Sequence, residues 1–265
     1  SVVVGRSCHY TEGAPMPFAY YRAFRWTKLG GMVPIYDPSA QLTSYACAYG
    51  VSADGSSLAG EASTGASDLQ AFRWDTSSGF QGLGGKKAMD ISANGEVVVG
   101  ITSTGAFRWT SSSGMVDIGT LYGPDSESRA HGVSRDGSTV VGYCFSPGVP
   151  YEAFAWTNPN GMVGLGNLPG GDFYFYSIAN AASDDGKVVV GYSESDVGTV
   201  PFRWTQTEGM VSLGTVPGYT TSTLHAEATN SDGTIIVGYG YSPGDGYISF
   251  IWDQVNGMRL LQDVL

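Results

Sequence analysis

Short runs of hydrophobic residues recur along this chain at a regular interval, each bounded by polar or glycine-rich residues. An apolar run ending in Gly, such as VVVG at 97–100, is followed by a phrase ending in Trp and then by Gly with Met or Phe. The Trp phrase occurs six times, as FRW at 24–26, 72–74, 107–109 and 202–204, as FAW at 154–156 and as FIW at 250–252. The runs are rich in β-branched and aromatic residues and show no sustained helical period. They therefore predict β-strands and an all-β fold.

A fourth recurrent element precedes the apolar run in five of the six units and ends in Asp-Gly or Asn-Gly, as in AHGVSRDG at 130–137. Because these dipeptides tolerate positive φ, each is expected to form a tight hairpin with the apolar run that follows. Four short strands in a unit that is repeated six times are typical of a β-propeller. We therefore predict a six-bladed β-propeller with four-stranded blades, forming a single domain over 1–265. Its units are approximately 1–46, 47–86, 87–128, 129–177, 178–224 and 225–265.

The first blade lacks its innermost strand within this chain, because the first apolar run has no such element before it. An unpaired strand edge is unfavourable in a soluble β-protein. We expect either an upstream segment or self-association with another chain to complete this blade.

The recurrent aromatic and arginine residues are interpreted as structural. A four-stranded blade must bury both faces against its neighbours, so the repeated Phe and Trp are predicted to form the core. The recurrent arginines are expected to pair with a turn aspartate such as Asp54 or Asp136. These arginines are Arg25, Arg73, Arg108 and Arg203.

One set of phrases is similar to a known family of repeats. The phrase GMVDIGTL at 114–121, followed by an Ala-x-Gly-Val-Ser-x-Asp-Gly hairpin, VVGY and an AFxW strand, resembles the HAF family of probable extracellular repeats. GMVGLGNLPGG at 161–171 and GMVSLGTVPG at 209–218 match the same pattern, whereas GFQGLGGKK in the second unit and GMRLLQDVL in the last depart from it. The resemblance covers essentially the whole chain. It implies a repeat fold of the propeller type and an extracellular or cell-surface location, and it carries over no catalytic residue.

Composition narrows the classes of partner. The net charge of −11 and the sequence pI near 4.5 argue against a broad electrostatic contact with nucleic acid or anionic lipid. No apolar run reaches the length of a membrane helix. From the charge we therefore expect no nucleic-acid partner, and from the run lengths no membrane insertion. The three cysteines are too few for a disulfide framework. Isolated thiols are the favoured interpretation, and a Cys8–Cys47 bridge is the alternative.

The candidate binding residues lie in the variable segments of the repeat. In a propeller the two longer kinds of connection share one end, and such loops usually carry function. Most of the tyrosines and all three histidines map to that end, and tyrosine combines a ring for stacking with a hydroxyl. The predicted ligand-binding residues are Tyr10, Tyr36, Lys87, Arg129, His131, Tyr174, Tyr176, Tyr219 and His225.

The innermost strands can be aligned on a shared alanine. The residues just before it are Cys47, Lys87, Arg129, Ile178 and His225, and those just after it are Tyr49, Met89, His131, Asn180 and Glu227. These positions are expected to surround the mouth of a central channel. Together with Lys86, their basic members would form a positive patch that could bind a carboxylate or sulfate. Solvated surface charge is the alternative interpretation.

Three classes of function follow from these features. The first is a secreted propeller that binds an extracellular polysaccharide or similar polymer through its tyrosine-rich end. The second is a polysaccharide lyase or glycosidase. In a lyase, Arg129 or Lys87 would neutralise a substrate carboxylate, while His131 or His225 and a tyrosine such as Tyr49 served as base and acid. A glycosidase would need two carboxylates, and the candidates are Asp37, Asp125, Asp172, Glu152 and Glu227. The third is a structural or assembly subunit of an extracellular polymer, favoured by the incomplete first blade.

No catalytic or cofactor motif decides between these classes. The sequence has no GxSxG, HExxH, Walker or CxxC motif, so enzymatic activity is left open and no cofactor is expected. GGD at 170–172 and GDG at 244–246 could supply oxygen ligands to a structural calcium ion.

Overall fold

The chain forms an all-β structure in two compact units. The computed structural model describes residues 1–10, 19–35, 45–63, 68–170, 176–219 and 223–265. Within these ranges it contains 23 β-strands and one short 3-10 helix, η1 (Leu261–Asp263). The two units are Ser1–Asp117 and Ile118–Leu265. Among the described residues, none of the helical structure has the length and apolarity to cross a membrane.

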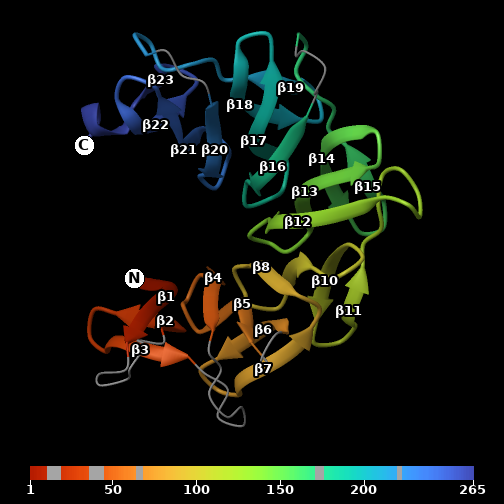
Figure 1. Ribbon diagram of the computed structural model, residues 1–265, viewed down its shortest axis with the longest axis vertical. Helices are drawn as coiled ribbons and strands as arrows, with labels where there is room; N and C mark the ends of the chain where they lie inside the picture. Colours follow the sequence, from red (N-terminus) through yellow and green to blue (C-terminus); the bar gives the residue numbers. More distant parts are fainter. Residues whose placement is uncertain (11–18, 36–44, 64–67, 171–175, 220–222) are drawn as a thin grey trace. The chain divides into compact units, whose positions relative to one another are not determined.

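Unit 1 contains three antiparallel sheets (Figure 1). Among the described residues the first sheet has three strands, with β1 at its edge. The strands in spatial order are β1 (Val2–Tyr10), β2 (Ala19–Thr27) and β3 (Gly31–Ile35); β4 (Ala46–Val51), β5 (Ser57–Ser63), β6 (Leu69–Asp75) and β7 (Gly79–Gly84); and β8 (Lys87–Ile91), β9 (Val98–Ile101), β10 (Ala106–Thr110) and β11 (Gly114–Asp117).

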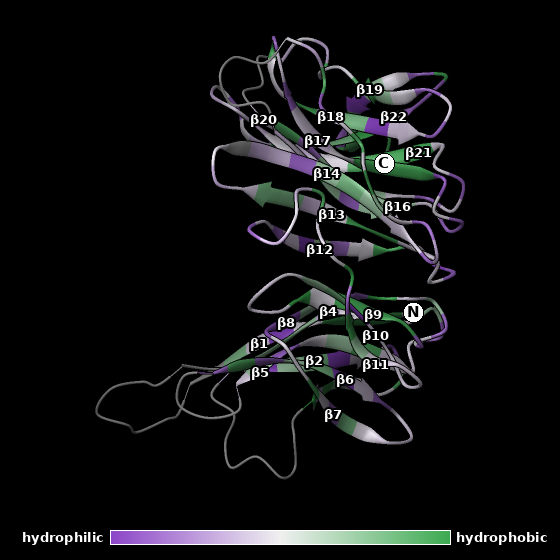
Figure 2. Cartoon of the chain, turned by 90° about the vertical axis from the view of Figure 1, so that its right-hand side faces the viewer, coloured by the Kyte–Doolittle hydropathy of each residue, from purple (hydrophilic) through white to green (hydrophobic). Residues whose placement is uncertain are grey.

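Unit 2 repeats the four-stranded arrangement three times. Its strands in order are β12 (Glu127–Val133), β13 (Thr139–Ser146), β14 (Val149–Thr157) and β15 (Gly161–Gly164); β16 (Ser177–Ala182), β17 (Val188–Ser195), β18 (Gly198–Thr205) and β19 (Gly209–Ser212); and β20 (Thr223–Thr229), β21 (Ile235–Ser242), β22 (Gly246–Asp253) and β23 (Gly257–Leu260). A single parallel pair, Thr199 with Thr223, joins the last two groups into one sheet. In Figure 2, strands such as β21 are largely green, the colour of hydrophobic residues, whereas many of the turns are purple, the colour of hydrophilic ones.

In five of the six apolar runs, the glycine that ends the run lies opposite a β-bulge in the preceding strand. In β12, Ala130 pairs with Gly142 and Gly132 pairs with Val141, so His131 is the extra, bulged residue. A Cβ atom at Gly142 would lie 1.9 Å from the carbonyl oxygen of Arg129, a distance that no side chain can occupy. The same close approach occurs at Gly60, Gly100, Gly191 and Gly238. The bulged residues are Tyr49, Met89, His131, Asn180 and Glu227, which are the positions that follow the shared alanine.

The core between neighbouring sheets is formed mainly by the phenylalanine of the Trp phrase. Phe202 on β18 is fully buried against Val141 and Ala153 of the preceding sheet. Equivalent buried residues are Phe72, Phe107, Phe154 and Phe250. Of the tryptophans predicted to be core residues, Trp109 is buried, and Trp74, Trp204 and Trp252 are half-buried and pack against the core clusters. Trp26 and Trp156 are also half-buried.

The arginine of the same strand points to the opposite face and contacts the next repeat. The Nε atom of Arg25 donates to the carbonyl oxygen of Gly55 at 2.7 Å, and that of Arg73 donates to Gly95 at 2.9 Å. In unit 2, Arg203 donates to Gly233 at 3.2 Å. The expected pairing with a turn aspartate is therefore wrong for Arg25 and Arg203, and Arg203 pairs instead with Glu208. Arg73 does form an ion pair with a turn aspartate, Asp75, whose carboxylate also accepts groups of its own β6–β7 turn.

The cysteines do not form the alternative bridge. Cys8 is exposed, Cys47 is buried, and both are free thiols, as is Cys144. The isolated-thiol interpretation therefore describes this structure.

The glycine opposite the bulge provides a test of the fold. We predict that Gly191→Ala lowers the free energy of unfolding by about 1–3 kcal/mol, because its Cβ would lie 2.0 Å from the carbonyl oxygen of Ile178. Gly244→Ala is the matched control, since a Cβ there meets nothing within 4 Å. Both exchanges change the unfolded chain equally. Urea denaturation followed by tryptophan fluorescence measures the difference, and equal effects of the two variants would contradict the prediction.

The hairpin turns give a second, pH-dependent test. The Asp54 carboxylate accepts the backbone N–H of Ser56 and the hydroxyls of Ser52 and Ser56, which lowers its pKa to about 2. Because the folded-state pKa lies below the ordinary value, this contribution to stability is present above about pH 4 and is lost as the pH falls towards about 2. At the equivalent position Asn94 accepts the Ser92 hydroxyl and the backbone N–H of Glu96.

We therefore predict that Asp54→Asn is less stable than the unmodified protein at neutral pH and that this difference shrinks in acid, because the neutral amide lacks the contribution of the carboxylate charge. Urea midpoints measured at neutral pH and near pH 3 provide the comparison. A loss of the same size at both values would show that charge is not the relevant property.

Candidate binding site

Six aromatic rings of unit 2 lie in contact across two neighbouring groups of strands. Tyr176 precedes β16 and Tyr192 lies on β17, whereas the other four rings come from β20, β21 and β22. Successive ring centroids are separated by 3.8–6.3 Å. We call this surface the aromatic strip, and its members are Tyr176, Tyr192, His225, Tyr239, Tyr241 and Tyr247.

The bulge geometry places the centre of the strip. Tyr192 follows Gly191, and Tyr239 follows Gly238, so each tyrosine comes directly after a glycine that accommodates a bulge. His225 lies opposite Tyr239 in the β20–β21 register. Its ring also stacks on Tyr192 with a centroid separation of 3.8 Å and an angle of 12°. We call each repeated group of strands a sheet module. The histidine lies between tyrosines of two modules, β16–β19 and β20–β23.

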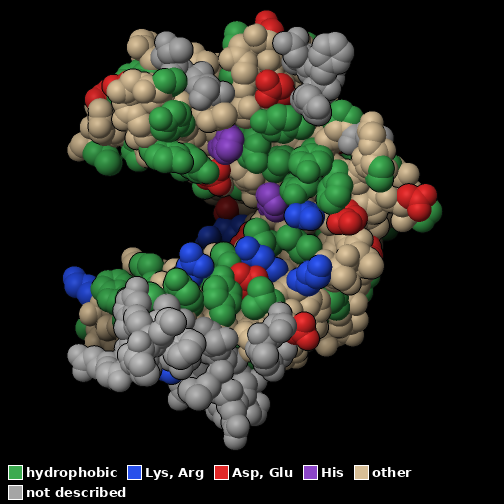
Figure 3. Space-filling model, viewed as in Figure 1, with side chains coloured by type: hydrophobic (Ala, Val, Ile, Leu, Met, Phe, Trp, Pro, Cys, Tyr) green, Lys and Arg blue, Asp and Glu red, His purple; other side chains and the backbone are tan. Residues whose placement is uncertain are grey.

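The central rings are uncharged at neutral pH. Burial lowers the pKa of His225, and burial with the neighbouring Tyr176 and Glu227 raises the pKa of Tyr192 to about 12. Burial also raises the pKa of Tyr176 and Tyr239. The outer end of the strip is open to solvent, where Tyr247 is 80% exposed. Figure 3 shows histidine side chains (purple) beside a broad group of hydrophobic and aromatic side chains (green) on this unit.

Three bulged residues form a polar line beside the strip. The Nδ1 atom of His131 lies 3.3 Å from the Oδ1 atom of Asn180. The Nδ2 atom of Asn180 donates to the carbonyl oxygen of Ala226 at 2.9 Å and contacts the Oε1 atom of Glu227 at 3.4 Å. Partial removal of water raises the pKa of the Glu227 carboxyl. The line supplies hydrogen-bonding groups next to the aromatic surface.

A second aromatic group lies on the sheet β12–β15. The rings of Tyr143 and Tyr151 stack with centroids 5.2 Å apart, and Phe145 lies 5.4 Å from Tyr151. The guanidinium carbon of Arg129 lies 5.3 Å from the centroid of Phe145. We call these four residues the Arg129 face. His131 contacts it edge-on through Tyr143.

In unit 1, charged residues and tyrosines take the place of the aromatic groups of unit 2, and they contact one another. The buried Glu61 carboxylate accepts the phenol hydroxyls of Tyr49 at 2.6 Å and Tyr45 at 3.0 Å. The Nζ atom of Lys87 lies 4.1 Å from the centroid of Tyr49, and Arg6 contacts the Tyr45 hydroxyl. Burial and the bond to Glu61 raise the pKa of Tyr49 well above its ordinary value. This phenol is therefore protonated at neutral pH, and its hydroxyl proton is donated to Glu61.

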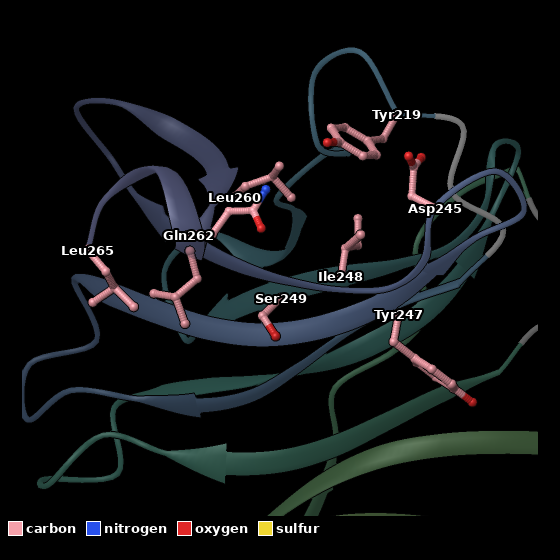
Figure 4. Close-up of a pocket in the computed structure, with 9 residues that line it drawn as sticks. Tyr219, Asp245, Tyr247, Ile248, Ser249, Leu260, Gln262 and Leu265 are labelled. Carbon is pink, nitrogen blue, oxygen red and sulfur yellow. The ribbon is translucent and has the colours of Figure 1, made fainter.

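A pocket of about 430 Å³ lies near the end of β23 (Figure 4). Tyr219, Asp245, Ile248, Leu260 and Gln262 line it. Tyr247 also contributes atoms, but Figure 4 shows its side chain on the other side of β22 from Ile248. Tyr219 thus belongs to this pocket and not to the aromatic strip.

The structure distributes the predicted binding residues over several places. Tyr176 and His225 belong to the aromatic strip, while Arg129 and His131 lie on the neighbouring sheet. Lys87 and Tyr49 lie in unit 1. Tyr36 and Tyr174 lie outside the described residues, and Tyr10 is the last residue of β1.

Sequence reasoning missed the tyrosines that follow the bulge-facing glycines. Tyr143, Tyr192 and Tyr239 were not among the predicted residues, because the prediction concentrated on the connections between strands. The signal was present, since the last three apolar runs read VVGY, VVVGY and IIVGY. An alignment of the units on this glycine finds these three positions.

The described residues contain no group of three or more His, Cys, Asp or Glu side chains placed to hold a metal ion. Of the suggested calcium-binding segments, Asp172 lies outside the described ranges, and Asp245 accepts the hydroxyl of Ser242 within its turn. Its carboxylate therefore serves the β21–β22 turn in this structure.

Comparison with known proteins defines the class of fold. No family model matches the sequence, and no curated protein is significantly similar to it. A TolB structure from Acinetobacter baumannii aligns over 98% of this chain and 68% of its own, with 13% identity and a TM-score of 0.55. A protein assigned as TolB from Agrobacterium tumefaciens aligns over 98% and 89%, with 13% identity and a TM-score of 0.54. A structure from a study of two prolyl endopeptidases aligns over 98% of this chain but only 42% of its own, with 11% identity and a TM-score of 0.62.

These similarities establish the fold and nothing further. TolB and the prolyl endopeptidase contain β-propellers, so the chain has an all-β fold of the β-propeller class. At such low identity the neighbours carry no assignment of activity to this chain.

The stacking of His225 on Tyr192 gives a testable pKa effect. We predict that Tyr192→Ala raises the pKa of His225 towards the ordinary histidine value, because water regains access to the imidazole. In the native protein the half-buried His225 favours the neutral imidazole, since burial lowers its pKa. The free energy of unfolding therefore decreases as the pH falls below about 6.5, where the unfolded chain takes up a proton at this histidine. Titration of the histidine ring protons by NMR measures the shift. Tyr247→Ala is the control, since Tyr247 contacts Tyr239 and Tyr241, and an unchanged His225 pKa in Tyr192→Ala would refute the stacking effect.

Proposed function

We propose that this chain is a secreted or cell-surface β-propeller that binds an extracellular polysaccharide, or a similar polymer, through the aromatic strip. The observation that carries the proposal is the unbroken contact of six rings across two sheet modules. Aromatic rings bind the apolar faces of sugars, and tyrosine adds a hydroxyl group that can bond to sugar hydroxyls. The extracellular location rests on the resemblance to the HAF repeats.

The form of the strip favours a polymer over a small ligand. It is an open surface at its outer end, where Tyr239, Tyr241 and Tyr247 are 43%, 42% and 80% exposed. Contiguous exposed apolar surface of this kind usually marks an interaction site. The strip is longer than a single ring contact, so it suits a ligand with several sugar units in a row. Asn180 and Glu227 beside it offer hydrogen bonds to the same ligand.

The proposal includes a closed architecture of six blades. It is supported by the repeated sheet modules and by the likeness to β-propellers. In this architecture a strand from an upstream segment or from a partner chain pairs with β1, which is the edge of a three-stranded sheet among the described residues. If a partner chain supplies the strand, the protein is also an assembly subunit of an extracellular structure.

A second candidate, a polysaccharide lyase acting at the same surface, is favoured by the environment of His225. Its neutral imidazole lies between Tyr192 and Tyr239, and a neutral histidine can act as a general base. The binding function requires no such chemistry. The two candidates differ in whether a bound polymer is cleaved.

We predict that truncation of the exposed strip tyrosines weakens polymer binding. Tyr247→Ala and Tyr239→Ala are expected to reduce affinity about tenfold each, corresponding to about 1.4 kcal/mol of lost stacking. Native gels containing one soluble polysaccharide at a time measure the retardation of the protein. The panel contains neutral, uronate-containing and sulfated polymers. Tyr122→Ala is the control, because Tyr122 is exposed and bonds to Glu152 on the other face of its sheet.

The outcomes separate the candidates. Retardation that the strip variants lose and the control keeps supports polysaccharide binding. Absence of retardation by every polymer, or equal binding by all variants, overturns it. Ultraviolet absorbance from unsaturated products in the same mixtures would instead establish the lyase.

A further inference from the structure

We propose that the Arg129 face is a subsite for an acidic sugar, in which Arg129 binds the carboxylate or sulfate group and Tyr151 stacks against the sugar ring. The inference rests on the proposed polysaccharide binding and names its substrate class as an anionic polymer. It assigns a separate role to the sheet β12–β15, next to the strip on β16–β22.

The strand register places the relevant side chains on one face of the sheet. Arg129 on β12 lies opposite Tyr143 on β13, and Tyr143 lies opposite Ala153 on β14. Phe145 and Tyr151 are each two residues away from members of this row, so they project to the same side. The rings of Tyr143 and Tyr151 are nearly parallel, at 26°. Tyr151 is 43% exposed, which leaves its ring accessible to a ligand.

Arg129 has little internal compensation for its charge. Its ion pair with Glu127 has an N–O distance of 4.0 Å, and the two side chains are 42% and 50% exposed. Such an exposed pair contributes little binding energy. The Nε atom of Arg129 is buried and has no hydrogen-bond partner among the described residues. The contact with Phe145 holds the guanidinium group in place. The guanidinium group can therefore bind an anion with little further loss of side-chain entropy.

The repeat shows that the fold does not require a cation at this position. The equivalent residues are Cys47, Lys87, Ile178 and His225. An isoleucine or a thiol satisfies the same backbone position, so the arginine is not needed to form the bulge. The net charge of −11 also excludes a general attraction between the protein and polyanions. Binding of an acidic polymer must therefore come from a local cationic group.

The position of the Arg129 face fits a ligand that also contacts the strip. His131, which packs on Tyr143, lies within hydrogen-bonding distance of Asn180, and Asn180 contacts Glu227 beside the strip. A polymer on the strip could thus extend to the neighbouring sheet. One sugar unit would then present its acidic group to Arg129.

The test compares two arginines of the same hairpin. Arg129→Gln removes the proposed anion contact, and Arg135→Gln makes the same charge change at the β12–β13 turn, where Arg135 is 55% exposed and pairs with Asp184. We expect Arg129→Gln to weaken binding of polygalacturonate or dextran sulfate about tenfold and to leave binding of a neutral polymer unchanged. Arg135→Gln should bind as the unmodified protein does. Glu127→Gln should strengthen binding of the acidic polymer, because it removes a competing carboxylate.

The two polyanions distinguish carboxylate from sulfate recognition. Loss of affinity for either one on Arg129→Gln, without loss in Arg135→Gln, supports the subsite and identifies its anion. Equal affinities of the two variants, or binding of neutral polymers only, overturn the subsite and leave polysaccharide binding intact.

A final measurement separates failure of the subsite from failure of the proposed function. Galacturonate is titrated into the protein while the arginine Nε–H signals are followed by NMR, with Arg129→Gln identifying the Arg129 signal. If galacturonate shifts this signal but no polymer retards the protein in the gel, the subsite is supported and polysaccharide binding is refuted. An unshifted signal together with no retardation refutes both.

Discussion

The close approach between a glycine and a carbonyl group beside a β-bulge is the constraint on which the arrangement of the candidate binding residues depends. The Arg129 carbonyl oxygen occupies the space that a Cβ at Gly142 would need, and the same contact recurs at Gly60, Gly100, Gly191 and Gly238. A bulge adds one residue to the strand that precedes the apolar run and redirects its side chain. The bulged residues can therefore vary from Tyr49 to Glu227 without changing the backbone, which makes this position suitable for specificity.

A second constraint links neighbouring modules within each unit. The strand that carries the Trp phrase has one face for each neighbour, since Phe202 packs against the preceding sheet and Arg203 reaches the turn carbonyl of the following one. The hydrophobic face supplies burial, and the arginine satisfies a backbone acceptor at the hairpin. Because both contacts use the same short strand, the modules can repeat while the connections between them diverge. The variable side chains at the strand ends are then free to serve binding.

The same frame carries different chemistry in the two units. The residue after the bulge-facing glycine is Glu61 or Ile101 in unit 1 and a tyrosine in each module of unit 2. In unit 1 the charges are used internally, because Glu61 accepts two phenol hydroxyls close to Arg6 and Lys87. In unit 2 the rings contact one another and leave their outer members exposed. This difference explains why the proposed ligand contacts concentrate on the second unit.

The sequence by itself determined the strands, the hairpins and the positions that follow the shared alanine, because these depend on local backbone preferences that each unit repeats. It indicated a role for Arg129, His131 and His225 for the same reason. Only the tertiary structure decided which aromatic residue fills the core. Phe202 and Trp204 lie two residues apart on the same face of their strand, but Phe202 is fully buried and Trp204 is half-buried. The tertiary structure also decided that Arg25, Arg73 and Arg203 bond to turn carbonyls and that Tyr192 stacks on His225 from another strand group. These contacts join residues far apart in the chain, and they depend on how one sheet packs against the next, which no local pattern of residues specifies.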